Sequence, residues 1–153
     1  MPKIAFLPVV ILWFGVYDFS KVSMIVFDAI FPVITATVAG IAAVEKELLW
    51  SARSLGASER RLWDEVTLTA ALPQVMTGLQ VALPIAIIVA VFTEMMMGGY
   101  GVGAAMITAA RFADSRGVFA GIVEIAVVGY IAVKAMAVLR RRMLAWHPES
   151  AAG

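Results

Sequence analysis

The chain has 153 residues, of which 62% are hydrophobic and 15% are charged, and its formal net charge at pH 7 is +1. A typical soluble domain is about 45–50% apolar and about 25% charged, so this composition excludes an ordinary soluble domain and indicates a membrane protein. The short basic clusters beside apolar runs argue against a nucleic-acid partner. Because the chain has no cysteine and one histidine, His147, thiol chemistry and a histidine metal cluster are excluded.

The first apolar segment, residues 4–17, follows Lys3 and has the length of a signal-peptide core. No small-x-small cleavage site follows it, and further apolar segments come directly after it, so we interpret it as a membrane segment. At 1.5 Å per residue it reaches about 21 Å, which is short of the ~30 Å hydrocarbon core. We therefore expect a helix that has lost its beginning or is half inserted.

Three longer apolar segments, residues 22–44, 70–93 and 117–138, are predicted to cross the membrane as helices. A glycine-rich break at 98–103, a short helix over 104–113 and a turn at 114–116 are expected between the last two. The predicted fold class is all-α, a polytopic transmembrane bundle with about four membrane segments. The predicted boundaries are a transmembrane domain at 1–146 and a flexible tail at 147–153.

A charged, amphipathic loop, residues 45–69, separates the second and third apolar segments. Leu48, Ala52 and Leu55 recur at helical spacing, which predicts a short helix with one apolar face. We expect Gly56 to end this helix by permitting a tight turn that a side chain would obstruct. Ser58 is placed to cap a second short helix.

This loop has two plausible uses by composition, an elbow held on lipid headgroups by Trp50 and Trp63, or a knob that docks into another protein. Its side of the membrane follows from the basic residues, which accumulate at cytoplasmic membrane ends. With the loop inside, Lys3 and both termini are also inside. The basic residues that share this side are Lys3, Lys46, Arg53, Arg60, Arg61, Arg140, Arg141 and Arg142. Lys21, Arg111 and Arg116 then fall outside.

The stretch SARSLGASERRLWDEVTLTAALP, residues 51–73, resembles the loop motif of the permease subunits of ABC importers. That motif reads Glu-Ala-Ala, three residues, Gly, nine residues, an aliphatic residue, one residue and Leu-Pro. The positions that match in register are Ala52, Gly56, Val66 and Leu68. The departures are Trp50, Ser51 and Thr69, where the family has Glu, Ala and Pro.

The resemblance covers nearly the whole chain. LPVVILWFGVYDFSKV and FPVITATVAGI upstream, and TGLQVAL, TEMM, GGYGVG and the arginine-rich last helix downstream, look like the nitrate/sulfonate/taurine branch of these permeases. Members of that branch carry one or two additional spans before the point where this sequence starts. The resemblance therefore implies an N-terminally truncated permease.

The resemblance implies a multi-pass subunit of the bacterial inner membrane that forms a translocation path and couples ATP hydrolysis to uptake of a small solute, such as nitrate, a sulfonate or taurine. The implied partners are an ABC ATPase subunit, a second permease copy as a homodimer, a periplasmic or extracellular solute-binding protein and the lipid bilayer. No cofactor, metal or catalytic residue is implied, and ATP hydrolysis belongs to the separate ATPase, since the sequence has no P-loop.

The resemblance also assigns coupling to one set of loop residues. They are Ala52, Gly56, Ala57, Ser58, Leu62, Val66 and Leu68. Leu55, Leu62 and Val66 are expected to form an apolar anchor, and the charged residues around them are expected to set the register of docking. The charged residues are Arg53, Arg60, Asp64 and Glu65.

Three acidic residues, Asp28, Glu94 and Glu124, lie in or beside predicted spans, where a charge is costly and often marks a pathway. Glu94, at a helix break, is the candidate gate or pathway residue, whereas Asp28 is expected near a span end. Two alternatives stay open, a membrane-embedded acid/base enzyme that uses these carboxylates and an inactive permease remnant. Gly117 and Gly121, four residues apart, predict close helix packing.

Overall fold

The computed structural model describes residues 3–144, and every regular element in that part of the chain is helical. In chain order the elements are η1 (Lys3–Phe6), α1 (Leu7–Phe14), α2 (Asp18–Ala42), α3 (Lys46–Ser54), α4 (Glu59–Arg61), η2 (Leu62–Thr67), α5 (Leu68–Met97), α6 (Val102–Arg111) and α7 (Ser115–Met143). The predicted tail at 147–153, with His147, lies outside the described residues.

Three helices of the described chain are long and apolar enough to cross a membrane. They run over Asp18–Ala42, Glu59–Met97 and Ser115–Met143, and they contain nearly all of the predicted spans 22–44, 70–93 and 117–138. Each helix begins before its apolar run, because a helix continues into water wherever its first turn is favourable. Asp18 in the first turn of α2 is an example, since a carboxylate is stabilised at a helix N-terminus.

The first apolar segment differs from the predicted span. Residues 4–17 form the 3-10 turn η1 and the eight-residue helix α1, which is about 12 Å long and therefore crosses less than half of a hydrocarbon core. The chain reverses after α1 at Gly15, whose φ is +74°. Ser20, which is fully buried, donates its hydroxyl to the Gly15 carbonyl oxygen at 2.6 Å and holds this reversal. The described chain thus has three membrane-length helices and not four.

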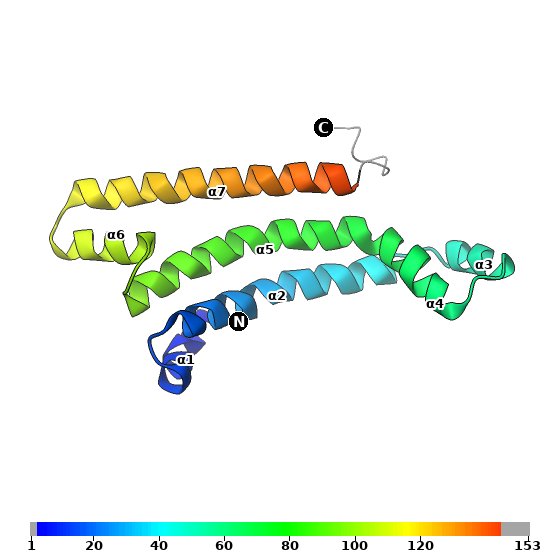
Figure 1. Ribbon diagram of the computed structural model, residues 1–153, viewed down its shortest axis with the longest axis horizontal. Helices are drawn as coiled ribbons and strands as arrows, with labels where there is room; N and C mark the ends of the chain where they lie inside the picture. The colour runs from blue at the N-terminus through cyan, green and yellow to red at the C-terminus, as the bar shows by residue number, and fades with distance from the viewer. Residues whose placement is uncertain (1–2, 145–153) are drawn as a thin grey trace.

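Helices α2 and α5 lie side by side along most of their length, and α5 lies between α2 and α7 (Figure 1). Two glycines allow the close approach. A Cβ at Gly78 of α5 would lie 2.6 Å from the Cβ of Ala36 and 2.9 Å from the carbonyl oxygen of Pro32, both on α2. A Cβ at Gly40 of α2 would lie 2.8 Å from the Cβ of Gln74. Leu7, Met24 and Val89 form a small buried cluster where α1, α2 and α5 meet.

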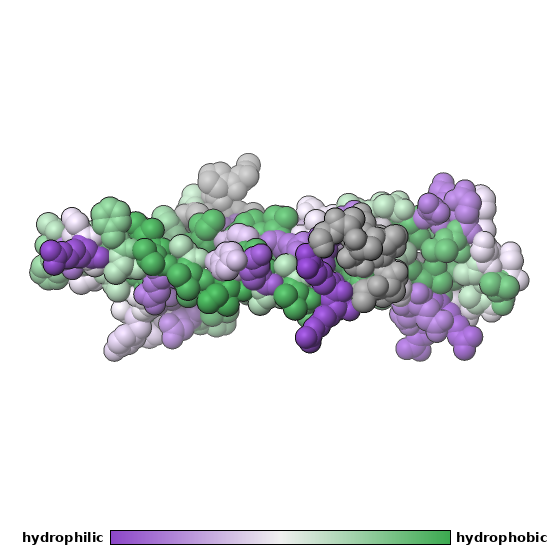
Figure 2. Space-filling view, turned by 90° about the horizontal axis from the view of Figure 1, so that it is seen from above, coloured by the Kyte–Doolittle hydropathy of each residue, from purple (hydrophilic) through white to green (hydrophobic). Residues whose placement is uncertain are grey.

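The two ends of the bundle differ (Figure 1). One end, here called the elbow end, carries α3, α4 and the C-terminal part of α7, and the opposite end, the far end, carries α1, α6 and the turns beside them. Figure 2 shows strongly hydrophilic residues in separate groups, at the elbow end, near the middle of the view and at the far end, with hydrophobic residues between them. Hydrophobic surface between polar ends is what a helical bundle in a bilayer requires.

Candidate functional site

The site with the strongest sequence signal is the elbow, defined here as residues 45–67. Its first arm is α3, which ends in a Schellman motif: the N–H of Ala57 bonds the carbonyl oxygen of Ala52 at 3.1 Å, and the N–H of Gly56 bonds that of Arg53 at 2.9 Å. Gly56 has φ +83°, the left-handed conformation that this motif needs. The prediction that Gly56 ends the first helix is confirmed.

The expected reason for glycine at this position requires a correction. A Cβ at Gly56 would meet no atom within 4 Å, so a side chain would not be obstructed. The backbone conformation, and not a lack of space, is what favours glycine there.

The second arm begins at Ser58, whose side-chain oxygen accepts from the N–H of Arg61 at 3.4 Å, as the sequence predicts for a cap. It does not remain a separate short helix. Helix α4 continues into the π-helical turn η2, where the Thr67 hydroxyl donates to the Leu62 carbonyl oxygen at 3.0 Å, and η2 continues into α5. The result is one uninterrupted helix from Glu59 to Met97.

The two arms are joined across the turn by one ion pair. A guanidinium nitrogen of Arg53 lies 3.2 Å from a carboxylate oxygen of Glu59. Arg60 and Asp64, one turn apart in the second arm, approach to 3.8 Å. All four side chains are exposed, and exposed pairs contribute about 0–1 kcal/mol, so these residues fix the shape of the elbow only weakly and remain accessible to a partner.

The tip of the elbow presents large apolar side chains to the outside. Leu55 is 88% exposed and Trp50 is 60% exposed, and both line a shallow hollow together with Glu47, Ser51 and Ser54. Leu62 is different, because it is 3% exposed and belongs to the inner packing of the elbow. The expected anchor of Leu55, Leu62 and Val66 is therefore corrected: Leu55 faces out, Val66 is half-buried, and Leu62 is not available to a partner.

The other predicted coupling residues are not all brought together: Ala52, Gly56, Ala57 and Ser58 surround the turn, whereas Leu68 lies about 15 Å further along the continuous helix. Ala52 and Ala57 are half-buried on the two sides of the turn, Gly56 and Ser58 are exposed, and Leu68 is exposed at the start of α5. Trp63, which the headgroup interpretation requires, is also exposed. Burial alone thus leaves both uses of the elbow open.

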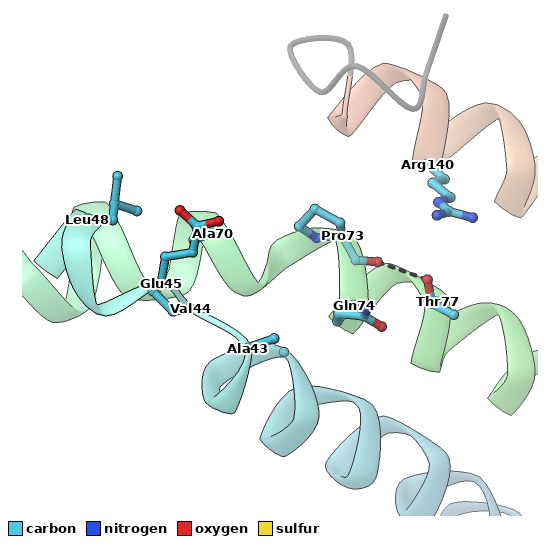
Figure 3. Close-up of a pocket in the computed structure, with 10 residues that line it drawn as sticks. Ala43, Val44, Glu45, Leu48, Ala70, Pro73, Gln74, Thr77 and Arg140 are labelled. Carbon is cyan, nitrogen blue, oxygen red and sulfur yellow. Dashed lines mark hydrogen bonds between the residues drawn. The ribbon is translucent and has the colours of Figure 1, made fainter. Parts of the chain in front are cut away.

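A second feature, which sequence reasoning missed, is a pocket of about 380 Å³ between the elbow and the bundle (Figure 3). Glu45 lies on its elbow side, Pro73, Gln74 and Thr77 of α5 line its floor, and Arg140 points into it from α7. Arg140 Nη1 also donates to Oε1 of Gln80 on α5 at 2.8 Å. The arginine cluster at 140–142 indicated orientation in the sequence, and no local pattern paired Arg140 with α5.

The three acidic residues of the spans are not brought together. Asp28 is ten residues inside α2, about 15 Å from its start, so it lies near the middle of the helix and not near a span end as predicted. Glu124 is exposed on α7. Glu94 lies in the last turn of α5, and its carboxylate accepts from the N–H of Gly103 at 2.9 Å. Within residues 3–144 no three His, Cys, Asp or Glu residues gather in a way that could hold a metal.

Comparison with known proteins decides the family. The family described as binding-protein-dependent transport system inner membrane component matches residues 1–145 of this chain. The chain belongs to this family of permeases. The taurine transport system permease protein of Escherichia coli (strain K12) is 32% identical to it over 149 residues, which is 97% of this chain and 54% of that relative. A putative aliphatic sulfonates transport permease protein of Bacillus subtilis (strain 168) is 37% identical over 146 residues, 95% of this chain and 53% of that relative.

A further permease relative, named for formylaminopyrimidine transport, comes from Halalkalibacterium halodurans and is 30% identical over 146 residues, 95% of this chain and 58% of that relative. The chain thus spans about half the length of the curated relatives it matches. The family places this permease chain in the inner membrane, in agreement with its apolar helices. Its relatives are transporter subunits, so the interpretation as a membrane-embedded acid/base enzyme is set aside.

Proposed function

We propose that this chain forms part of the solute path of an ABC importer and that its elbow couples ATP hydrolysis by a separate ATPase subunit to solute uptake. The proposed solute class is a small sulfonate such as taurine, because relatives carry taurine and aliphatic sulfonates in their names. Nitrate, which the resemblance also implies, stays a candidate. The elbow end is proposed to face the cytoplasm, where the ATPase is found.

The observation that carries the proposal is the uninterrupted helix from Glu59 to Met97. Its first residues belong to the elbow, and its last residues lie at the far end of the bundle (Figure 1). A displacement of the elbow by a partner would therefore be passed along one continuous helix to the helices that pack against α5, namely α2, α6 and α7. A flexible linker at this point would absorb the same displacement.

The exposed tip supports docking into a protein. Leu55 and Trp50 are apolar and exposed, Glu47 lines the same hollow, and the exposed ion pair of Arg53 and Glu59 lies in the same elbow. An apolar centre with a charged rim is the usual anatomy of a protein interface. We propose that the ATPase contacts Leu55 together with the exposed residues of the predicted coupling set, which are Gly56, Ser58 and Leu68. Leu62, which is buried, supports the elbow from inside.

Two further partners are proposed: a solute-binding protein, from the family, and a second permease copy, from the exposed surface of α7. A solute-binding protein follows from the family description. A second permease copy is supported by α7, because no residue in its spanning window is buried within this chain. A homodimer that covers one side of α7, with lipid on the other, would account for that exposure.

The proposal is tested with Leu55→Asp in the assembled transporter. Leu55 is almost fully exposed, so the variant should insert normally, while ATPase capture and solute uptake should each fall by about tenfold or more. The matched control is Phe112→Asp, the same kind of change at a side chain that is 81% exposed at the far end, which should capture the ATPase normally. Unchanged capture by Leu55→Asp would favour the headgroup interpretation and overturn docking. If the unaltered chain captures no ATPase or takes up no solute, the inactive remnant is favoured.

A second variant separates docking from coupling. Gly56→Asp should alter the turn between the arms, because residues other than glycine are disfavoured at its φ. We expect it to uncouple ATP hydrolysis from uptake while membrane insertion stays intact. Normal uptake by this variant would contradict the role of the elbow in coupling.

A further inference from the structure

The far end of α5 reverses direction within four residues. The N–H of Gly98 bonds the carbonyl oxygen of Glu94 at 2.8 Å, which closes α5, and α6 starts at Val102. Gly98, Gly99 and Gly101 all have positive φ, at +71°, +89° and +133°. Each of these conformations disfavours a side chain, so the turn depends on its glycines.

The side chain of Glu94 joins the two helices across this turn. Its Oε2 accepts from the N–H of Gly103 at 2.9 Å, and Gly103 is the second residue of α6. The first N–H groups of a helix have no partner within the helix, and a negative charge is stabilised there by the helix dipole. The carboxylate of α5 thus supplies the cap that α6 lacks from its own Gly101.

The space for this contact is made by the glycines of α6. A Cβ at Gly101 would collide with the carboxylate of Glu94, and a Cβ at Gly103 would collide with the carbonyl oxygen of Val91 on α5. Gly103 is buried in this contact. The first turn of α6 therefore lies directly on the last turns of α5, with the Glu94 carboxylate between them.

Helix α6 in turn holds the far end of α7. A Cβ at Gly121 would collide with the side chain of Met106, and a Cβ at Gly117 would lie 2.9 Å from the Cβ of Ala109. The predicted packing role of Gly117 and Gly121 is confirmed, with α6 as the partner. The orientation of α6 on α5 therefore sets where α7 stands at this end of the bundle.

We propose that Glu94 is a positioning residue for transport: its carboxylate clamps α6 onto α5 and, through α6, places the far end of α7. The assignment rests on the proposed function where uptake is the readout. It differs from a gate or pathway role in how the carboxylate acts. A pathway residue acts through its charge on a solute or proton, whereas a clamp acts through an oxygen that accepts a hydrogen bond.

The test compares Glu94→Gln with Glu94→Ala in the assembled transporter. The amide of glutamine keeps an acceptor oxygen at the same reach, so Glu94→Gln should keep uptake within about fivefold of the unaltered protein, the size of a charge–dipole effect. Glu94→Ala removes the acceptor and should lower maximal uptake by more than about tenfold. The solute concentration for half-maximal uptake should change in neither variant. Gly129→Ala is the control, since a Cβ there meets nothing within 4 Å.

Hydrogen exchange at the first turn of α6 gives a readout that needs no transport. Amide exchange over residues 102–105 should be faster by about tenfold or more in Glu94→Ala and close to unaltered in Glu94→Gln. Equal defects of the two variants in uptake would overturn the clamp in favour of a role of the charge, and unchanged exchange in Glu94→Ala would overturn it outright. If the transporter moves no solute in any form, the proposed function fails, and the exchange result still decides the role of Glu94.

A double-mutant cycle of Glu94 and Gly101 tests the same proposal. Gly101→Ala forces a Cβ into the Glu94 carboxylate in the unaltered protein, but not once Glu94→Ala has removed that carboxylate. The double variant should therefore accelerate exchange by less than the product of the two single effects. Strictly independent effects would mean that Gly101 and Glu94 do not share a contact and would overturn the clamp.

Discussion

Arg140 of α7 donates from Nη1 to Oε1 of Gln80 of α5 at 2.8 Å, although the two residues are 60 positions apart in the chain. Both side chains are half-buried, and the bond joins the last turn of α7, which holds Arg140, to the middle part of α5, which holds Gln80. Because α5 is continuous with the second arm of the elbow, this bond ties α7 to the same continuous helix that the elbow would move. Helix α7 is thus held to α5 at two places, through α6 at the far end and through Arg140 at the middle part of α5.

Replacement of Gln80 by leucine should destabilise the bundle, because the guanidinium of Arg140 loses its acceptor. Hydrogen bonds to charged groups contribute about 1.5–3 kcal/mol, and Arg140 makes a further interaction, so we expect a loss near 1.5 kcal/mol in the free energy of unfolding. Gln80→Glu keeps an acceptor oxygen and should not show this loss. Denaturant unfolding of the solubilised protein measures both. Equal stability of the leucine variant and the parent would show that the bond contributes nothing.

The extent to which the sequence predicts this structure differs from feature to feature. The three long helices follow from apolar length, and the Gly56 turn and the Ser58 cap follow from local chemistry that acts within a few residues. The Arg140–Gln80 bond and the Glu94–Gly103 bond depend on which helices become neighbours in the fold. No local sequence pattern predicts those neighbours. The continuity of the elbow with α5 was also missed, because the charges at 59–65 resemble a break although they are compatible with a helix.

Insertion of a methyl group at Gly78 should weaken the contact between α2 and α5. In Gly78→Ala the new Cβ would lie 2.6 Å from the Cβ of Ala36 and 2.9 Å from the Pro32 carbonyl oxygen, so the helices must separate. Overpacking of this kind costs about 1–3 kcal/mol. Gly129→Ala, where a Cβ has open space, is the matched control and should leave the free energy of unfolding unchanged or slightly raise it. A Gly78→Ala protein as stable as the control would contradict the close approach.

Removal of the cap at Ser58 should loosen the second arm of the elbow. The Ser58 side chain accepts from the Arg61 N–H at the long distance of 3.4 Å on an exposed surface, so Ser58→Ala should cost about 0.5 kcal/mol, the low end of the range for caps. Hydrogen exchange at the Arg61 amide is the measurement, and about a twofold acceleration is expected. Ser58→Asp retains a capping oxygen and should exchange like the parent. A faster rate in both variants would indicate that the hydroxyl is not the relevant acceptor.

The side of the membrane that the elbow occupies can be tested directly by labelling a single introduced cysteine. The chain contains no cysteine of its own, so no other thiol of this chain would be labelled. Ser54→Cys places a thiol on the exposed tip of the elbow, and Tyr100→Cys places one at a far-end position that is 96% exposed in the parent. The basic residues around the elbow favour retention on the cytoplasmic side. A membrane-impermeant maleimide should therefore label Tyr100→Cys in intact cells and Ser54→Cys only after the membrane is opened. Labelling of Ser54→Cys in intact cells would place the elbow outside, where no cytoplasmic ATPase could reach it.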